Sequence, residues 1–488
     1  MNSEEFKKAG EEMIDYIANY RATISKRPVV TKEKPGYMRN FVPLKAPMKG
    51  EKWKHIMEDV DKIIIPGLTH WVHPHFYSYF PMGASLPSLL GTVITGAFGC
   101  SGSTWFTSPA STELEIIIID WVAKLLGLPE KFLFHKEGRQ GGGCLRGSAS
   151  ECILMTVCAA QWAALHELKK KQPSTPDGEL LTSLVAYCSK EAHSCVEKAC
   201  LIAMVTLRIL DTDDRCRFRG KDLEEAVKKD LEGGLNPFFV VGTFGTTSST
   251  AIDKFDELGS ICVKYGLWLH IDGAYGANAL VCPEIRHLAK GFEYASSINM
   301  NPSKWMLMHL DCSIIWVEDR FQYVQSLCPK STPMNVHPDT QMIDFYQWGT
   351  DDRRRFRALK MWVTIRKFGV EGIQKYVRNH IQLAKKFEEL VRGDDRFEVM
   401  NDVNFGLVCF RFKGTNEINA KILAAIDASR MLFMVPASLG NTYIIRFSVN
   451  YEESTEKEIL YAWEIIKNTV EELDLTIDEM YDSLEYFY

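Results

Sequence analysis

The chain has 488 residues and a formal net charge of −6, and 46% of its residues are hydrophobic. This balance excludes a strongly basic nucleic-acid binder, and the length suits two or three packed lobes. The longest apolar runs, such as residues 116–119 and 238–241, are far too short to cross a bilayer. The 13 cysteines contain no C-x-x-C pair, and no apolar signal segment is present at the N-terminus. We therefore expect reduced thiols in a cytoplasmic protein with no nucleic-acid and no membrane partner.

The N-terminal segment is expected to begin with a helix. Ser3 stands before two acidic residues, and apolar side chains recur at helical spacing from Phe6 to Ile17. This apolar stripe must be covered either by another subunit or by a distant part of the same chain. Several prolines make residues 27–47 an extended connector, and a second helix is expected over residues 53–65.

An aromatic stretch with three histidines follows at residues 67–81. The histidines have H-x-x-H-x-H spacing, but no acidic residue or cysteine stands beside them, and Pro74 interrupts any regular element. A metal site is therefore not expected. Aromatic side chains crowded onto irregular backbone are typical of a pocket wall, and a plain core position is an equally good interpretation.

A second candidate feature is the sequence around Ser148. Residues 112–128 predict an apolar helix, and the glycines at 141–143 then indicate a turn that leads through Gly147 into a helix over about residues 152–171. Small hydroxyl residues at a helix N-terminus leave free N–H groups that point at one spot. This arrangement suits a phosphate or carboxylate, although the serines could equally be simple helix caps.

Strand and helix signals then alternate. Continuous apolar runs predict strands at residues 184–188, 238–241, 267–271 and 313–317, and this pattern indicates a mostly parallel sheet covered on both faces. His193, Thr247 and Asp272 come just after three of these strands, at the edge where open α/β sheets bind ligands. Lys304 precedes the fourth strand and can reach the same edge.

Lys304 and Asp272 define the chemistry expected there. Lys304 follows a proline and lies between apolar segments, and burial lowers the pKa of a lysine so that its amine can attack a carbonyl. A surface lysine is the plainer alternative. Asp272 ends a buried strand and needs a positive partner, which a pyridinium N–H would provide. If His193 also lies near the pyridinium ring and the turn at Ser148 binds a phosphate, these residues together provide the groups that pyridoxal phosphate requires.

The C-terminal part is expected to form a smaller α/β lobe. Residues 328–350 are polar, contain three prolines and show little periodicity, which is typical of a long mobile lid loop. A helix is expected from the arginine-rich residues 353–357 to about Phe368, and the clearest later strands are residues 405–412 and 442–449. The acidic tail after Glu471 is expected to be a surface helix or partly disordered.

Eight motifs resemble one family: Pro66–Trp71, Ser108–Glu115, Gly141–Glu151, Ala192–Ser194, Gly245–Thr247, His270–Tyr275, Asn301–Trp305 and Arg354–Lys360. On these residues the chain resembles the group II pyridoxal-phosphate-dependent amino-acid decarboxylases, in particular the animal aromatic-L-amino-acid (DOPA) decarboxylases. The resemblance implies the α/β fold type I of pyridoxal-phosphate-dependent transferases. That fold has a mostly parallel central sheet with helices on both faces and a smaller C-terminal α/β domain. It also implies a homodimer with active sites between subunits.

The resemblance further implies three segments and a set of residue roles. The segments are an N-terminal helical part that packs across the dimer (1–85), a large cofactor-binding domain (86–375) and a small C-terminal domain (376–488). Lys304 would form the internal aldimine, Asp272 would pair with the pyridine nitrogen, and His193 would stack on the ring and position the substrate. The expected cofactor-binding residues are Ser148, Ala149, Ser150, His193, Thr247, Asp272, Ala274, Asn301, Ser303 and Lys304. The expected substrate residues are Trp71, Tyr79, Phe80, Pro81, Met82, Ser101 and Ser103, and no metal is expected.

The chain departs from the family pattern at several of these positions. Ser303 replaces a usual histidine, so we expect weaker cofactor binding. Met82 replaces a common threonine, and Ser101 and Ser103 replace an isoleucine and a phenylalanine. The pocket should therefore be wider and wetter, with roughly a few kcal/mol less apolar contact. Charged residues 351–353 replace an apolar run; they either select a polar substrate or are merely solvated, and we favour solvation.

The fourth departure concerns the product. Residues 329–333 lack the tyrosine that in the family protonates the substrate carbon after decarboxylation, and changes there are associated with aldehyde synthases, in which oxygen intercepts the carbanion. The leading hypothesis is a decarboxylase of an L-amino acid, with an aromatic one as the default. The second is an aldehyde synthase that releases aldehyde, ammonia and hydrogen peroxide, and the third is a fold-retaining dimer with little activity. His193 argues against the second, and the presence of Lys304, Asp272 and His193 together argues against the third.

Overall fold

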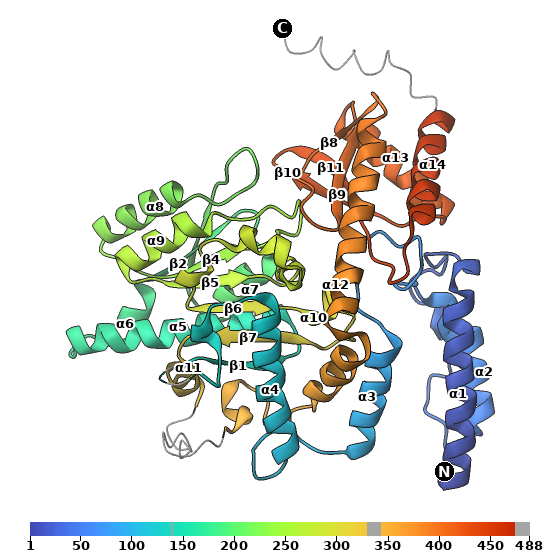
Figure 1. Ribbon diagram of the computed structural model, residues 1–488, viewed down its shortest axis with the longest axis horizontal. Coiled ribbons are helices and arrows are strands. Elements are labelled where there is room, and N and C mark those ends of the chain that lie inside the picture. Colours follow the sequence, from blue (N-terminus) through green and yellow to red (C-terminus); the bar gives the residue numbers. More distant parts are fainter. Residues whose placement is uncertain (137, 139, 329–342, 474–488) are drawn as a thin grey trace.

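The structure is a computed structural model that describes residues 1–136, 138, 140–328 and 343–473. Two sheets organise the chain, a large one in its middle and a small one toward its C-terminus (Figure 1). The helices are α1 (Ser3–Thr23), α2 (Trp53–Asp59), α3 (Leu86–Phe98), α4 (Pro109–Leu126), α5 (Ala149–Lys171), α6 (Asp177–Thr182), α7 (Ser194–Ile202), α8 (Gly220–Glu232), α9 (Phe255–Tyr265), α10 (Pro302–Trp305), α11 (Arg320–Leu327), α12 (Arg357–Arg392), α13 (Asn416–Ser429) and α14 (Glu456–Glu472).

The large sheet has seven strands in the order β1-β7-β6-β5-β4-β2-β3. Neighbours from β3 to β6 are parallel, whereas β7 is antiparallel to both β6 and β1, so the mostly parallel sheet is confirmed. The strands are β1 (Gly142–Arg146), β2 (Leu184–Ser189), β3 (Thr206–Leu210), β4 (Asn236–Thr243), β5 (Trp268–Asp272), β6 (Ser297–Met300) and β7 (Ser313–Val317).

Both faces of this sheet are covered by helices. Alternate residues of a strand point to opposite faces, and the buried side chains of β2 and β4 accordingly divide into two cores. Ala186 and Phe239 pack with residues of α5 and α7 on one face. Val185 and Val240 pack with residues of α8 and α9 on the other. The continuous apolar runs seen in the sequence therefore reflect strands buried on both sides.

The turn predicted at residues 141–143 is wrong, because Gly142 and Gly143 lie within β1. A Cβ atom on Gly143 would lie 2.3 Å from the carbonyl oxygen of Ile315 and 3.1 Å from Cγ2 of Ile119. The glycine is therefore required by the close approach of β7 and α4 rather than by a turn. The turn itself is short, and α5 begins at Ala149, earlier than predicted.

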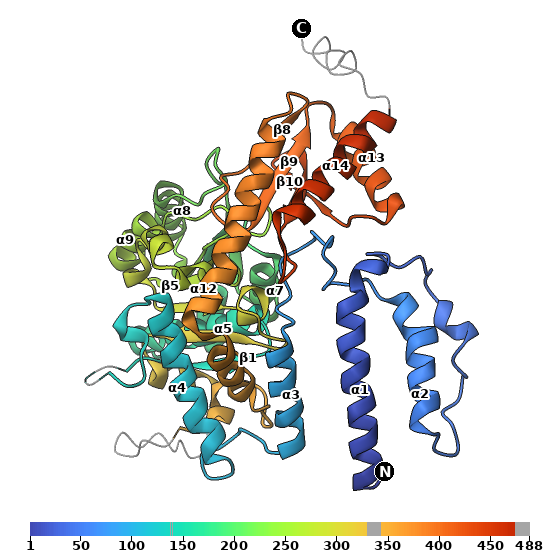
Figure 2. The same ribbon diagram turned by 45° about the vertical axis from the view of Figure 1, so that its right-hand side comes forward.

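The small sheet is antiparallel, with the order β10-β11-β9-β8. Its strands are β8 (Phe397–Val399), β9 (Leu407–Phe412), β10 (Val435–Leu439) and β11 (Thr442–Ser448). Helix α12 starts at Arg357, later than predicted, and runs to Arg392 with non-helical backbone at Gly369. Figure 2 shows it extending from α3 to this sheet. The boundary proposed at residue 375 therefore falls inside a helix.

The N-terminal helices lie at one side of the molecule, and both views place α1 beside α2. The hydroxyl of Tyr16 on α1 donates a hydrogen bond to Asp61, just beyond α2, over 3.2 Å. Ala9 is buried, but Phe6 and Ile14 remain 69% and 47% exposed. The apolar stripe of α1 is thus only partly covered by this chain.

Part of the long segment predicted as a mobile lid is packed into the core. Residues Phe345–Trp348 form a short helical turn, and the rings of Phe345 and Trp348 are buried. Because the segment as a whole is polar, its composition did not indicate that these two aromatic residues would be buried. Residues 329–342, including the predicted lid centre and the missing tyrosine, lie outside the described residues, as do tail residues 474–488. Within the described ranges, no helix is long and apolar enough to cross a membrane.

Candidate functional site

A cavity of about 180 Å³ opens at the carboxyl edge of the large sheet. The ends of β4 and β5, the N-termini of α5 and α7, and α10 all contribute residues to it. Most of the cofactor-binding residues predicted from the sequence meet here, although they lie on five separate segments. The lining residues are Phe80, Ser148, Ala149, Ser150, His193, Cys195, Thr243, Gly245, Thr247, Asp272, Ala274, Tyr275, Asn301 and Lys304.

One end of the cavity is the N-terminus of α5. The Ser148 hydroxyl caps the helix by accepting a hydrogen bond from the Glu151 N–H. The Glu151 carboxylate in turn accepts from the Gly147 N–H at 2.9 Å, which fixes the turn. The N–H groups of Ala149 and Ser150 occupy the first turn, where an α-helix provides no internal acceptor. This end can therefore bind an anion such as a phosphate.

Asp272 forms an acidic part of the cavity wall. Its Oδ1 accepts hydrogen bonds from the Ala274 N–H at 3.0 Å and from the Asn299 side-chain amide at 3.1 Å. Among the described residues Oδ2 accepts no hydrogen bond, so this oxygen remains for a ligand in the cavity. A buried carboxylate oriented in this way suits a cationic N–H donor.

Lys304 lies on α10, which begins at Pro302 directly after β6. Its Nζ is 5.2 Å from the centroid of the Phe80 ring, and the guanidinium of Arg446 lies 5.0 Å from the same ring. Desolvation lowers the pKa of Lys304; Arg446 also lowers it, and Asp272 opposes the shift. The amine is thus easier to deprotonate than an exposed lysine, which favours attack on a carbonyl.

His193 caps the N-terminus of α7. Its Nδ1 accepts a hydrogen bond from the Cys195 N–H at 3.1 Å, so the proton of the neutral ring resides on Nε2. Desolvation lowers the pKa of His193, Lys304 adds to this effect, and the Asp272 charge opposes it. The cavity is therefore bordered by a neutral imidazole with an N–H available to donate.

Asn301 and Ser303 differ in orientation, although both were expected to bind the cofactor. The Ser313 hydroxyl donates to Oδ1 of Asn301 at 2.6 Å, which leaves the Asn301 amide N–H₂ to donate into the cavity. The Ser303 hydroxyl instead donates to the Cys312 carbonyl at 2.9 Å, and the side chain is buried behind the wall. Ser303 thus lies beside the cavity without facing it.

The predicted substrate residues are more dispersed. Phe80 lines the cavity and stacks on Tyr275 with ring centroids 3.8 Å apart. Tyr79 is exposed and stacks on Trp71. Trp71 and Met82 border a separate narrow cleft, and Pro81 is buried.

Ser101 and Ser103 bind a different part of the chain. Their hydroxyls share a hydrogen bond of 2.6 Å, and Ser103 donates to the Asp352 carbonyl. The Arg354 N–H donates to the Ser101 hydroxyl at 3.3 Å. Two departures from the family pattern, the serines and the charged segment, are therefore in contact, while the Asp351, Asp352 and Arg353 side chains are exposed.

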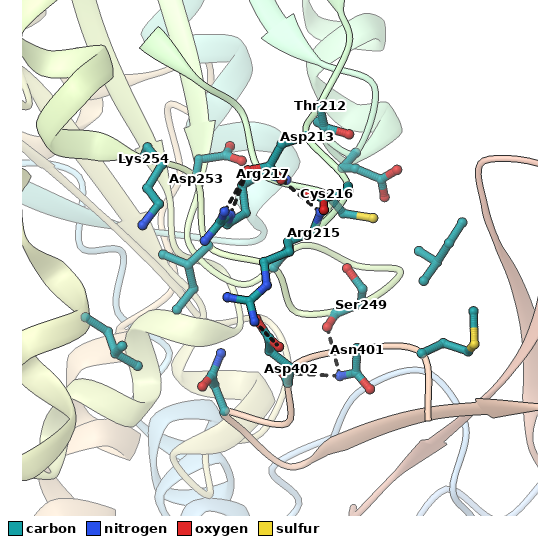
Figure 3. A pocket seen from close by; sticks show the side chains of 18 of the residues that line it. Thr212, Asp213, Arg215, Cys216, Arg217, Ser249, Asp253, Lys254, Asn401 and Asp402 are labelled. Atoms are coloured by element: carbon teal, nitrogen blue, oxygen red, sulfur yellow. Dashed lines mark hydrogen bonds and ion pairs between the residues drawn. The ribbon is translucent and has the colours of Figure 1, made fainter. Parts of the chain in front are cut away.

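A larger cleft of about 900 Å³ lies between the large sheet and residues 399–404 (Figure 3). Some of its charged side chains pair with one another: Arg217 contacts Asp213 at 2.8 Å, and Arg215 contacts Asp402 at 3.5 Å. Ser249, on the loop that follows β4, accepts a hydrogen bond at its carbonyl from the Asn401 amide. Several of the cleft's charges are thus paired within it, whereas the smaller cavity has a distinct anion end and a carboxylate oxygen left for a ligand.

Five lining or neighbouring residues were missed from the sequence: Cys195, Thr243, Gly245, Tyr275 and Arg446. Arg446 comes from β11 in the small sheet, and its guanidinium also donates to the Tyr79 carbonyl at 3.0 Å. The position of an arginine within the apolar run of residues 444–447 was an available signal. Such a run predicts burial, and arginine is seldom fully buried without a partner. Cys195 and Thr243 gave no comparable signal.

Comparison with known families and proteins shows similarity over nearly the whole chain. Residues 35–413 match the model of the pyridoxal-dependent decarboxylase conserved domain. The chain is 43% identical over 471 residues to aromatic-L-amino-acid decarboxylase of Bos taurus, covering 96% of each protein. It is 41% identical over 481 residues to histidine decarboxylase of Drosophila melanogaster, covering 98% of this chain but only 57% of that longer protein.

Solved structures are similar in fold and coverage. Tryptophan decarboxylase of Catharanthus roseus in complex with L-tryptophan is 34% identical with a TM-score of 0.91, covering 97% of this chain and 99% of that one. The 4-hydroxyphenylacetaldehyde synthase of Rhodiola rosea is 34% identical with a TM-score of 0.90 and the same coverage.

Proposed function

Because this chain belongs to the pyridoxal-dependent decarboxylase family, we propose that it decarboxylates an aromatic L-amino acid with Lys304 as the lysine that holds the cofactor. The enzyme is a pyridoxal-phosphate-dependent amino-acid decarboxylase of fold type I. In the proposed reaction the bond between Cα and the carboxylate breaks, carbon dioxide leaves, and a proton takes its place on Cα. The products are one amine and one carbon dioxide.

The observation that carries the residue assignment is the cavity itself, because it brings together three groups that pyridoxal phosphate requires. The N-terminus of α5 would hold the phosphate, Oδ2 of Asp272 would accept the pyridine N–H, and Lys304 would hold the aldehyde carbon. When bound, pyridoxal phosphate withdraws the electron pair that the departing carboxylate leaves on Cα. The residues of this chain fit that group in number, charge and placement.

The remaining residues would orient the substrate and exclude water. His193, with its proton on Nε2, would donate a hydrogen bond near the substrate carboxylate. Phe80 and Tyr275 form a stacked aromatic wall next to Lys304 and would limit access of water to its amine. An aromatic substrate is supported by this wall, by the similarity to aromatic-L-amino-acid decarboxylases, and by the tryptophan bound in the Catharanthus enzyme.

Release of labelled carbon dioxide tests this proposal. Protein supplied with pyridoxal phosphate would be given carboxyl-¹³C-labelled L-amino acids, aromatic and non-aromatic, with Lys304→Ala as the matched control. We expect ¹³CO₂ from at least one aromatic amino acid and none from the control. Release from non-aromatic amino acids alone would overturn the aromatic assignment.

A second candidate function is aldehyde synthesis, in which one amino acid, one oxygen molecule and one water give aldehyde, carbon dioxide, ammonia and hydrogen peroxide. The similarity to the Rhodiola aldehyde synthase supports it, as does the lack of a tyrosine at residues 329–333. These residues lie outside the described part of the chain. The two functions differ in whether a proton or oxygen reaches the Cα carbanion, so peroxide distinguishes them.

We also propose a homodimer, formed through α1 and α3. The exposed apolar side chains of these helices are Phe6, Ile14, Leu86, Leu90, Val93, Ile94 and Phe98. A soluble monomer seldom leaves so many large apolar side chains of two helices uncovered. Light scattering of the purified protein should give twice the 55.6 kDa mass of one chain.

A further inference from the structure

Five polar residues lie in a row on one face of the large sheet, directly behind the proposed cofactor site. Trp268, His270 and Asp272 alternate along β5, so their side chains share a face. Ser297 and Asn299 alternate along β6, and the strand register pairs His270 with Ser297 and Asp272 with Asn299. The row is therefore a consequence of the W-x-H-x-D and S-x-N spacing in two adjacent parallel strands.

Hydrogen bonds join these residues end to end. The Trp268 indole lies 2.8 Å from the Ser297 hydroxyl, and that hydroxyl lies 2.8 Å from Nδ1 of His270. Nε2 of His270 lies 2.8 Å from Oδ1 of Asn299, and the Asn299 amide nitrogen lies 3.1 Å from Oδ1 of Asp272. His270, Ser297 and Asn299 are completely buried, so solvent cannot replace the hydrogen bonds of these three residues.

The direction of each bond follows from the chemistry of the groups. Asp272 accepts from the Asn299 N–H₂, so Asn299 presents its carbonyl oxygen to His270, and Nε2 of His270 must carry a proton. Burial lowers the pKa of His270 to about 4, against the opposing effects of Asp272 and Asn299, so the ring holds only this one proton near neutral pH. Nδ1 must then accept from the Ser297 hydroxyl, whose oxygen accepts from the Trp268 N–H.

We propose that Trp268, Ser297, His270 and Asn299 form a directed hydrogen-bond chain that positions Asp272 for the cofactor ring, with every donor pointing toward the carboxylate. No hydrogen bond in this series can reverse its donor-to-acceptor direction, because the indole at one end only donates and the carboxylate at the other end only accepts. Its last bond occupies Oδ1 and leaves Oδ2 for the pyridine N–H. The four residues act through Asp272 and are positioning residues. This role rests on the proposed function, since it concerns the same cavity.

The proton positions are tested first, because they do not depend on catalysis. Neutron diffraction from perdeuterated crystals, with and without pyridoxal phosphate, locates deuterium on His270 and Asn299. We expect deuterium on Nε2 and none on Nδ1 of His270, with the ND₂ group of Asn299 facing Asp272, in both crystals. Deuterium on Nδ1 alone, or a reversed Asn299 amide, would overturn the proposal whether or not the enzyme decarboxylates aromatic amino acids.

The second test uses Asn299→Leu to remove the hydrogen bond that joins this series of residues to Asp272. The matched control is Tyr187→Phe, which removes a 2.8 Å hydrogen bond from Tyr187 on β2 of the same sheet to the buried Asp230 carboxylate on α8. Loss of a hydrogen bond to a charged group predicts about tenfold weaker cofactor binding for Asn299→Leu. The ¹⁵N signal of bound [¹⁵N]pyridoxal phosphate should also move toward the unprotonated ring position. The control should lose a similar amount of thermal stability, while its cofactor affinity and its ¹⁵N signal should stay unchanged.

The outcomes separate this inference from the proposed function. Wild-type protein that binds the cofactor and releases labelled carbon dioxide, combined with an unchanged ¹⁵N signal in Asn299→Leu, contradicts the hydrogen-bond chain alone. Wild-type protein that releases no carbon dioxide contradicts the proposed function alone. The deuterium positions then decide whether the proposed hydrogen-bond chain is correct.

Discussion

The buried ion pair between Arg354 and Glu115 is predicted to be a principal stabilising contact around the site. The Arg354 guanidinium donates to both carboxylate oxygens of Glu115, at 2.7 and 3.1 Å, and to the Leu145 carbonyl at 2.8 Å. Glu115 also accepts from the Leu145 N–H at 2.8 Å. Both charged side chains are only 2% exposed. The pair thus ties α4 and the segment before α12 to β1, which leads into Ser148.

Replacement of Arg354 by methionine leaves the Glu115 carboxylate buried, with the Leu145 N–H as its one remaining donor among the described residues. Removing one partner of a buried ion pair typically costs about 3–5 kcal/mol, far more than the pair contributes relative to apolar side chains. We therefore expect Arg354→Met to lower the free energy of unfolding by that amount. The double variant with Glu115→Leu should lose at least about 1 kcal/mol less than the sum of the two single losses.

Urea unfolding followed by tryptophan fluorescence, with refolding checked by dilution, measures these differences. The matched control is Arg378→Met, which removes an exposed pair with Glu284 at 2.6 Å and should cost less than about 1 kcal/mol. An Arg354→Met loss as small as that of the control, or additive losses in the double variant, would refute the reasoning.

Further predictions concern cofactor, pH and assembly. Borohydride reduction should fix pyridoxal phosphate to the wild-type peptide containing Lys304 and not to Lys304→Ala; a label on another lysine would contradict the assignment. Because the His193 pKa is lowered, its neutral form should persist below pH 6.5, so kcat/KM should hold from pH 8 to about 6.5 and fall only in more acidic buffer. His193→Gln should lack this acid limb. Ser303→Ala should leave the cofactor Kd within about threefold, since the lost hydroxyl faces Cys312; a larger change in equilibrium dialysis would place Ser303 in the site. Leu90→Lys with Ile94→Lys should halve the mass seen by light scattering, and an unchanged mass would exclude α3 as the interface.

The parts of the site that the sequence predicted share a local origin. His193 follows an apolar strand, Asp272 is the last residue of another, and Lys304 comes shortly after a proline at the start of a short helix. In a parallel sheet the strand ends converge, so local pattern alone brings these side chains to one edge. The parallel strand order of the large sheet therefore explains why these three side chains meet around one cavity.

The parts that could not be predicted depend on contacts between distant segments. Arg446 reaches the Phe80 ring from the other sheet, and the orientations of Ser303 and Asn301 depend on hydrogen bonds to Cys312 and Ser313. Glycines at 142 and 143 favour a turn by composition, and only the approach of neighbouring backbone explains their place in a strand. Residue type gives the available chemistry, whereas side-chain direction requires the packed structure.

The most direct test of the central claim is the identity of the product in air. Holoenzyme would be given the aromatic L-amino acid that releases the most carbon dioxide, and amine, aldehyde, ammonia and hydrogen peroxide would be measured together. The proposed decarboxylase predicts one amine for each carbon dioxide and no peroxide. Aldehyde with equimolar ammonia and peroxide would contradict it and establish the oxidative reaction instead.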